Sequence, residues 1–313
     1  MELRQLRYFV SIVDHGSLSR AALVLHIAQP ALTQQLRQLE DELGAQLLHR
    51  SAQGVLSTDA GKVFYQHAQA ILKQVADAKS AVTQSTSKPT GTVAIGVPQS
   101  ISGALALPLL LAAQQQYPEI ELQLTEELTG NLIEQLKAGR INLAVLFDDG
   151  QLGSFAGTPM VEEEMMFVCR ANSQFAPASA SKRVSLTQAL GTTLILPGLP
   201  HGVRPRIESA ARKAGLLLAH VIEINSVAIL KSAILADMGA TIIPLAPLLD
   251  DIERASMLAY PIAPPGISRS VTLCCSKTIP LTNAASAVAR LVLEVTDELA
   301  NSGRWLGTQI LPR

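Results

Sequence analysis

Hydrophobic residues recur every three or four positions in three short segments at the start of the chain, which predicts three short helices. The first segment, residues 3–15, is followed by a glycine, a residue that often closes a helix. Ser17 precedes the second segment, residues 18–25, and is a favoured N-cap residue. The third segment, residues 29–43, carries Pro30 in its first turn, where a helix tolerates proline.

The third predicted helix has one apolar face, and its other face is polar and rich in hydrogen-bond donors. The residues on this face and at its N-terminal tip are Gln29, Pro30, Thr33, Gln34 and Arg37. A helix of this kind can lie in the major groove of double-stranded DNA and contact base edges, while its N-terminus meets phosphate. The alternative is a helix face that is simply solvated.

Residues 47–57 predict a small β-hairpin with its turn at residues 52–54. A hairpin directly after two such helices is typical of a winged helix-turn-helix, which favours the DNA-binding interpretation. Arg50 and Gln53 lie on this hairpin. We expect them to hold the DNA backbone and so to position the protein rather than read sequence.

The next pattern is a long helix with a single apolar seam, which begins after Thr58 and continues to about residue 85. Hydrophobic residues follow one another at alternating spacings of four and three, the repeat of a coiled coil. They are Phe64, Ala68, Ile71, Val75, Ala78 and Val82. This seam predicts a homodimer, and a dimer implies paired half-sites on DNA. The alternative is a helix that packs on its own domain.

From residue 92 onward, short apolar strands alternate with helical patterns, which predicts α/β structure with a mostly parallel sheet. The first such series ends near residue 147, and a second covers residues 165–244. Three consecutive glutamates, residues 162–164, stand between the two series. We expect them to face water, because adjacent like charges are usually solvated.

Composition fits a globular protein of two or three compact units, since 48% of the 313 residues are hydrophobic and 16% are charged. No stretch predicts a membrane span or a signal peptide. The three cysteines are too few for a disulfide framework and predict reduced thiols in a cytoplasmic protein. Residues 1–90 carry a net charge of +2 and the remainder carries −3, which favours DNA binding by the N-terminal part.

Several signatures in the first 65 residues occur in order and at fixed spacing. They are Ala21-Ala22, the run from Leu25 to Gln35, Leu39-Glu40, Leu43-Gly44, Leu47-Leu48 with Arg50, and Thr58 with Ala60-Gly61. Together they resemble the LysR-type transcriptional regulators, and residues 24–35 are similar to the nitrogen assimilation control branch of that family. Many members carry serine where this chain has Ala28, which removes one hydroxyl from the helix tip.

The resemblance implies an α/β fold class: an N-terminal all-α winged helix-turn-helix, followed by an effector domain of two subdomains like a periplasmic binding protein. The expected boundaries are 1–58 for the DNA-binding domain, 59–87 for the linker helix, 88–91 for a hinge and 92–313 for the effector domain. Subdomain I would comprise residues 92–161 and 267–313, and subdomain II residues 162–266, with crossings near Val161 and near residues 261–266. The resemblance further implies an activator or repressor that is often tetrameric and can contact RNA polymerase.

Ligands of open α/β sheets bind beyond the carboxyl ends of the strands, where helix N-termini offer free N–H groups. The residues at these positions are Gln99, Ser100, Thr129, Gly130, Phe147, His201, Asn225 and Ser226. Several can donate hydrogen bonds to a carboxylate, so the predicted effector is a small organic acid. The alternative for each residue is an N-cap or a turn without a ligand.

The six histidines show no metal-ligand spacing, and no nucleophile motif or phosphate-binding loop is present, so we expect no metal, no cofactor and no enzymatic activity. Three other interpretations stay open. The chain could be a regulator that acts through its abundance without an effector. It could be a metabolic solute-binding α/β protein, which leaves the polar helix and the seam unexplained. It could also be an architectural DNA-binding protein, which leaves the α/β region without a role.

Overall fold

The computed structural model describes residues 1–51, 54–83, 88–148, 150, 152–177, 183–199 and 203–313. The chain divides into two compact units, an N-terminal unit of residues 1–85 and a C-terminal unit formed by most of residues 86–313. In the described part of the chain, no helix is long and apolar enough to cross a membrane. The predicted fold class is confirmed, because helices and a hairpin precede a two-part α/β region.

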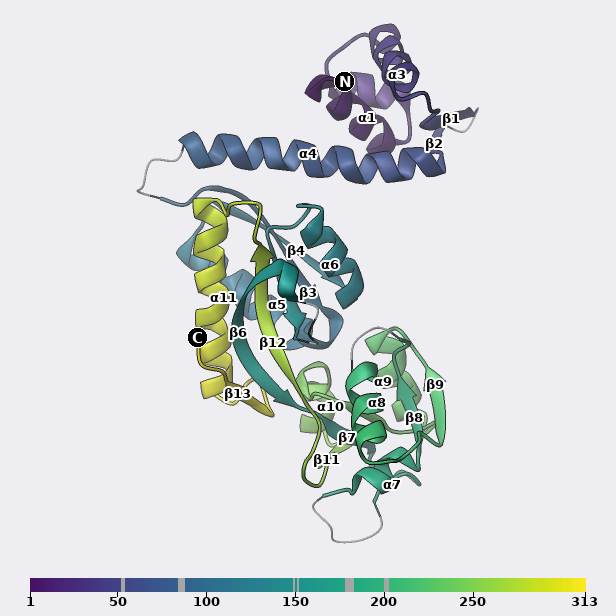
Figure 1. Ribbon diagram of the computed structural model, residues 1–313, viewed down its shortest axis with the longest axis vertical. Helices are drawn as coiled ribbons and strands as arrows, with labels where there is room; N and C mark the ends of the chain where they lie inside the picture. Colours follow the sequence, from purple (N-terminus) through teal and green to yellow (C-terminus); the bar gives the residue numbers. More distant parts are fainter. Residues whose placement is uncertain (52–53, 84–87, 149, 151, 178–182, 200–202) are drawn as a thin grey trace. The chain divides into compact units, whose positions relative to one another are not determined.

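The N-terminal unit contains short helices, a β-hairpin and one long helix (Figure 1). Their bounds are α1 Leu3–His15, α2 Leu18–Val24, α3 Gln29–Leu43, β1 Leu48–Ser51, β2 Gly54–Ser57 and α4 Asp59–Thr83. Gly16 and Gly44 end α1 and α3 with φ angles of 59° and 62°, which glycine adopts without a steric penalty. Ser17 caps α2 by accepting a hydrogen bond from the Arg20 amide. Apolar residues of α1, α2 and α3 pack into one small core.

A mixed sheet forms the first half of the C-terminal unit, with strand order β13-β6-β12-β5-β3-β4. Within this sheet β3, β4 and β5 are parallel, and β12 joins them antiparallel to β5. Apolar residues of α5 and α11 pack on one face of the sheet and those of α6 on the other. The bounds are β3 Gly91–Pro98, α5 Gln99–Gln116, β4 Ile120–Glu127, α6 Thr129–Lys137, β5 Leu143–Phe147, η1 Leu152–Ser154, β6 Phe155–Glu164, β12 Ser268–Ser276, α11 Asn283–Asn301 and β13 Thr308–Ile310.

The second half of the C-terminal unit has its own hydrophobic core and two small sheets, with strand orders β10-β7-β11 and β8-β9. The bounds are β7 Met166–Arg170, α7 Leu186–Leu190, β8 Thr193–Leu196, α8 Arg204–Lys213, β9 His220–Glu223, α9 Val227–Leu235, β10 Thr241–Ile243, η2 Ala246–Leu248, α10 Leu249–Glu253 and β11 Met257–Pro261. The long strands β6 and β12 lead from one half to the other (Figure 1).

The first crossing between the halves lies at Met165 and not near Val161, because β6 continues to Glu164. Its last residues pair with the start of β12, in the register Ser268 to Glu164 and Arg269 to Glu163. At the crossing itself, the Met165 amide donates to the Ile267 carbonyl at 2.8 Å. The two connecting strands therefore leave the first sheet as a hydrogen-bonded pair.

The expectation that residues 162–164 all face water is wrong for Glu163, which is 1% exposed. Its carboxylate lies 2.6 Å from Nη2 of Arg269, which is equally buried. The other carboxylate oxygen accepts a hydrogen bond from Trp305 Nε1 at 2.9 Å. Strand alternation explains the pattern: Val161 and Glu163 point inward, and Glu164 is exposed. Glu163 is buried because its charge is paired and hydrogen-bonded.

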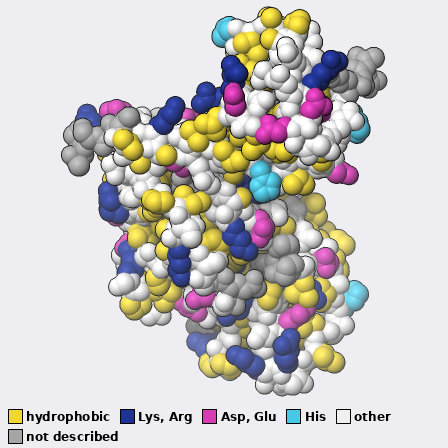
Figure 2. All heavy atoms as spheres, turned by 45° about the horizontal axis from the view of Figure 1, so that its top comes forward, with side chains coloured by type: hydrophobic (Ala, Val, Ile, Leu, Met, Phe, Trp, Pro, Cys, Tyr) yellow, Lys and Arg dark blue, Asp and Glu magenta, His cyan; other side chains and the backbone are white. Residues whose placement is uncertain are grey.

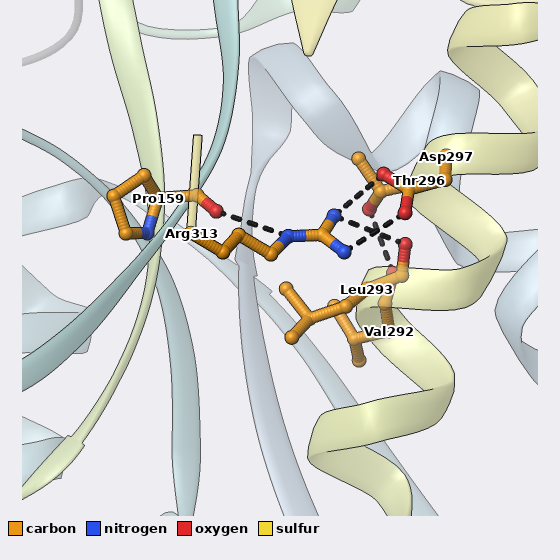
Figure 3. Close-up of polar contacts among 6 residues, drawn as sticks. All are labelled: Pro159, Val292, Leu293, Thr296, Asp297 and Arg313. Carbon is orange, nitrogen blue, oxygen red and sulfur yellow. Dashed lines mark hydrogen bonds and ion pairs between the residues drawn. The ribbon is translucent and has the colours of Figure 1, made fainter. Parts of the chain in front are cut away.

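The end of the chain is attached to the first half through Arg313 (Figure 3). Nη1 and Nη2 of Arg313 donate to the two carboxylate oxygens of Asp297 in α11, at 2.8 Å and 2.6 Å. Nε donates to the Pro159 carbonyl of β6 at 3.4 Å. Arg313 thereby links α11 to β6, the elements on either side of the C-terminal segment. Two bonds to one carboxylate are a geometry that arginine favours.

Replacing Glu163 with alanine leaves Arg269 buried without its counter-ion, so we expect a loss of about 3–5 kcal/mol in the free energy of unfolding. Urea unfolding followed by the fluorescence of Trp305, the single tryptophan of the chain, measures this loss. Glu164→Ala is the matched control, since this neighbour is exposed. We expect the control to change stability by less than about 0.5 kcal/mol. Equal effects of the two substitutions would show that the buried pair does not stabilise this unit.

Candidate functional site

Helix α3 presents the predicted polar surface. Leu32, Leu36 and Leu39 are buried against the core of the N-terminal unit, which fixes the orientation of the helix. On its outer side, Gln29, Pro30, Gln34 and Arg37 are exposed and Thr33 is half-buried. Nε2 of Gln29 donates to Oγ1 of Thr33 at 3.1 Å, so these two side chains form one polar group at the helix tip. The N-cap residue, Ala28, makes no side-chain cap, which leaves the first amide groups of α3 available to a phosphate.

The hairpin after α3 is attached to it by a residue for which the sequence suggested no role. One carboxylate oxygen of Glu40 accepts hydrogen bonds from the amides of Leu47 and Leu48, at 2.8 Å and 3.1 Å. Glu40 stands within the family signature, and that signature was the signal that could have identified it. Of the predicted hairpin residues, Arg50 lies on β1, and its backbone pairs with that of Val55. The side chain of Arg50 is not among the parts that the structure describes. Gln53 lies outside the described residues.

The structure divides the predicted seam of α4 into two groups. Phe64 packs edge-on against Phe9 of α1, with ring centroids 5.2 Å apart, and Ala68 is fully buried in the same core. Ala68 is thus buried in the core of its own unit and has no surface left for a second copy, whereas Phe64 is half-buried and its part in a dimer stays a prediction. The remaining residues are open to solvent or half-buried: Ile71, Val75, Ala78 and Val82. Residues 84–87, the end of the expected linker, lie outside the described residues.

In the C-terminal unit, a cleft lies where strand ends of its two halves meet. Five of the predicted effector residues line it: Gln99, Ser100, Thr129, Phe147 and Asn225. Gly130 and Ser226 do not belong to its lining, and Ser226 caps α9 instead, accepting from the Ile229 amide. His201 lies outside the described residues. The strand-end rule thus predicted five residues of this cleft, but it could not separate cleft-lining side chains from helix caps.

The cleft is narrow and mostly apolar. Its free volume is about 50 Å³, room for a few water molecules, so a larger ligand requires the walls to move apart. Nine of the fourteen described residues that line it are apolar, and among these fourteen Glu127 is the charged one. Sequence reasoning missed Glu127, although it ends β4 and the strand-end rule applies to it as well as to Thr129.

The polar groups of the cleft are held in place by neighbours outside it. Oδ1 of Asn225 accepts from the Gly198 amide at 2.8 Å, which leaves the amide nitrogen of the side chain as a donor. Oγ of Ser100 accepts from Nη2 of Arg269 at 2.9 Å. The guanidinium of Arg269 also lies 3.7 Å above the Phe147 ring. Arg269 is not among the described lining residues, but it contacts two of them. The sequence carried no signal that distinguished Arg269 from the other arginines.

The three cysteines do not form a reactive site. Cys169 and Cys274 are buried and Cys275 is half-buried. Burial raises the pKa of Cys169 to about 11 and that of Cys274 to about 12. Thiols with raised pKa values contain little of the nucleophilic thiolate at neutral pH. Among the described residues, no three His, Cys, Asp or Glu side chains are grouped in a way that could hold a metal ion.

Basic side chains are not concentrated on the face drawn in Figure 2, where Lys and Arg lie scattered among hydrophobic and uncharged groups. The exposed side of α3 illustrates this, since Arg37 is its one cation beside the neutral Gln29 and Gln34. Recognition through such a surface would depend on hydrogen bonds to base edges as well as on charge.

Comparisons with known proteins cover both units. Residues 3–62 match the family described as "Bacterial regulatory helix-turn-helix protein, lysR family", and residues 86–297 match the "LysR substrate binding domain". The chain is 35% identical to the nitrogen assimilation regulatory protein nac of Klebsiella aerogenes over 98% of its length and 99% of that protein. It is 27% identical to a hydrogen peroxide-inducible genes activator of Pectobacterium carotovorum subsp. carotovorum, over 94% and 96%.

Among solved structures, the chain resembles a full-length OxyR variant from Pseudomonas aeruginosa. The TM-score is 0.70 and the identity 20%, with 95% of this chain and 94% of that chain covered. This likeness concerns the fold and extends over both units.

The exposed part of the α4 seam leads to a prediction about assembly. Replacing Ile71, which is 37% exposed, with glutamate should place a charge against its counterpart in a second copy. We expect the dissociation constant of the dimer to rise at least about tenfold, measured by sedimentation. Gln74→Glu is the matched control, because Gln74 is exposed on the same helix outside the seam. An unchanged assembly of Ile71→Glu would place the dimer contact elsewhere.

Proposed function

The chain belongs to the LysR family of bacterial regulatory helix-turn-helix proteins, and on this basis we propose that two copies read paired DNA half-sites while a small organic acid in the cleft controls their activity. The observation that carries the proposal is the convergence of five predicted effector residues on one cleft, in a chain whose α3 presents a polar face. The protein is a transcriptional regulator of the LysR type; the ligand, the site residues and the assembly are what we propose.

For DNA, we assign the reading of base edges to Gln34, Thr33 and Gln29 and the closest phosphate contacts to the N-terminus of α3. Glutamine side chains can contact adenine through two hydrogen bonds, and arginine contacts guanine in the same way, which gives Arg37 a reading role too. Arg50 and Gln53 of the hairpin would hold the backbone on either side. The bonds from Glu40 to the hairpin amides keep hairpin and helix in one orientation.

The exposed seam residues of α4 would pair two chains, and pairing of dimers into a tetramer extends the same arrangement. A two-fold dimer requires two half-sites whose spacing matches the distance between its reading helices. We place the protein in the cytoplasm, where its DNA target is, and RNA polymerase is the partner through which it would change transcription.

For the effector, the cleft favours a molecule with an apolar body and one group of hydrogen-bond acceptors. Its wall is mainly apolar, and the side chains of Ser100, Thr129 and Asn225 supply donors. A small carboxylic acid meets both requirements. Because the free volume of the cleft is small, such a ligand would bind an arrangement with separated walls and shift the population toward it.

Peroxide sensing, which the names of some relatives suggest, is not favoured by the thiols of this chain. A redox sensor needs an accessible thiolate of low pKa. Here burial raises the pKa of every cysteine. Regulation by abundance alone is the remaining alternative, and the effector experiment below separates it from our proposal.

Replacing Gln34 with alanine should remove contacts to one base pair in each half-site. We expect a loss of about 1–3 kcal/mol at a cognate operator and a relaxed preference at that position, measured by binding titrations on operator variants. Gln35→Ala is the matched control: it makes the same chemical change on a half-buried neighbour that is bonded to Gln38. Parent-like binding by Gln34→Ala would mean that another surface reads the DNA.

Replacing Ser100 with leucine should fill the cleft and leave the DNA-binding unit untouched. In a thermal-shift screen of small carboxylates, we expect hits that stabilise the parent and fail to stabilise Ser100→Leu, with operator affinity unchanged. Ser302→Leu, the same change at an exposed helix end outside the cleft, should respond like the parent. If every hit stabilised Ser100→Leu as well, the effector site would lie elsewhere; a screen without hits would favour regulation by abundance.

A further inference from the structure

A second hollow of the C-terminal unit lies apart from the cleft, between helix α8 and the segment that leads into β12. Its free volume is about 440 Å³, and no described residue lines both it and the cleft. This volume is within the usual range of small-molecule sites. Part of its wall is apolar, including Leu186, Pro265 and Ile267, and its charged lining residues among those described are two cations, Arg206 and Lys213.

Both cations come from one face of α8. Arg206, Ser209 and Lys213 follow one another at spacings of three and four residues, which places them on the same side of the helix. The backbone positions of the two cations are about 10 Å apart along the helix axis, and Ser209 stands between them. The long side chains of arginine and lysine can therefore converge on one group that lies over Ser209.

The charge of Arg206 has no counter-ion among the described residues, in contrast to that of Arg204, which pairs with Glu208 at 2.6 Å. Nη2 of Arg206 donates only to a backbone carbonyl, that of Asp148. Arg206 lies in the first turn of α8, where the helix dipole opposes a positive charge. Burial lowers the pKa of Arg269, and the nearby charge of Arg206 lowers it further. An anion beside Arg206 would relieve both repulsions.

The opposite rim of the hollow does not attract anions. Oγ of Ser268, which lines this rim, donates to a carboxylate oxygen of Glu162 at 2.5 Å, so its proton is already bound. The donors that face the hollow without such a carboxylate are those of α8. An anionic group would therefore lie on the α8 side, and the rest of the ligand would lie against the apolar wall.

We propose that this hollow is a second ligand site, in which Arg206, Ser209 and Lys213 bind the phosphate of a small phosphate monoester whose apolar body lies against Leu186 and Ile267. A phosphate matches two cations and a hydroxyl because it carries a charge near −2 at neutral pH and three acceptor oxygens. The site uses no residue of the cleft, so it does not depend on the proposed effector.

The same ligand would act on a contact between the two halves of the unit. Arg206 belongs to the second half, and the carbonyl that it contacts, that of Asp148, follows β5 in the first half. A phosphate held by Arg206 would fix the side chain that makes this contact. The site is therefore suited to regulation of the C-terminal unit.

Calorimetric titration of the full-length protein with three probes tests the ligand class. The probes are phenyl phosphate, inorganic phosphate, which lacks the apolar body, and benzyl alcohol, which lacks the charge. We expect phenyl phosphate to bind at least about fivefold more tightly than either of the others, since each lacks one of the two contacts. Absence of binding by phenyl phosphate, or equal affinity of either other probe, would overturn the proposal.

Substitutions in α8 locate the site. Arg206→Ala should weaken phenyl phosphate about tenfold, because it removes a half-buried charged donor. Lys213→Ala should weaken it about threefold, because an exposed charge contributes less. Arg212→Ala is the matched control: it removes the same charge from the neighbouring exposed residue, which does not line the hollow, and should stay within twofold of the parent. Equal losses in Arg212→Ala and Lys213→Ala would mean attraction by general positive charge.

Ser100→Leu separates this site from the cleft. We expect it to bind phenyl phosphate like the parent, because Ser100 lines only the cleft. A loss of binding in Ser100→Leu would place the phosphate in the cleft and refute the second site. Should Arg206→Ala fail to fold, Lys213→Ala against Arg212→Ala still decides, since both residues are exposed at the end of α8.

Discussion

Arg269 and Glu163 face each other on the two strands that connect the halves of the C-terminal unit, and both are almost completely buried. A buried ion pair costs free energy unless further hydrogen bonds satisfy its polar groups, and here all but Nη1 of Arg269 have a partner among the described residues. Glu163 has Trp305 as its second partner, and Arg269 has Ser100 and the face of Phe147. These contacts tie the start of α5, the end of β5 and the C-terminal segment to the crossing strands. A change at any of them would leave a charge incompletely compensated.

This arrangement places a wall held by a buried ion pair beside the cleft, which the proposed ligand would open. Ser100 and Phe147 belong to the first half of the unit, and Asn225 and Leu230 belong to the second. The two halves have separate hydrophobic cores, so they can move apart without exposing either core. The crossing strands are hydrogen-bonded to each other up to Glu164 and again at Met165. We expect a movement of one half relative to the other to be centred there. The pair thus anchors the first half, and the proposed ligand would act on the distance to the second.

Local patterns were sufficient to predict much of this molecule. The helices of the N-terminal unit follow from apolar spacing, Gly16, Ser17 and Pro30, all of which act within a few residues. The strand-end rule located the cleft, since parallel strands bring their carboxyl ends to one edge. What failed depended on distant partners. Glu163 and Arg269 are separated by 106 residues, and no local signal shows that one neutralises the other. Likewise, the spacing of apolar residues along α4 cannot show that Ala68 is buried in the core of its own unit.

The central claim is that an acceptor-bearing molecule occupies the cleft beside Ser100 and separates its walls. Hydrogen–deuterium exchange of the full-length protein, with and without saturating 3-methylbutanoate, tests it most directly. We expect slower exchange at the amides of residues 98–102 and 223–230, which form opposite walls, and faster exchange at the crossing near Met165. Unchanged exchange in both walls, or protection confined to another part of the chain, would contradict the claim.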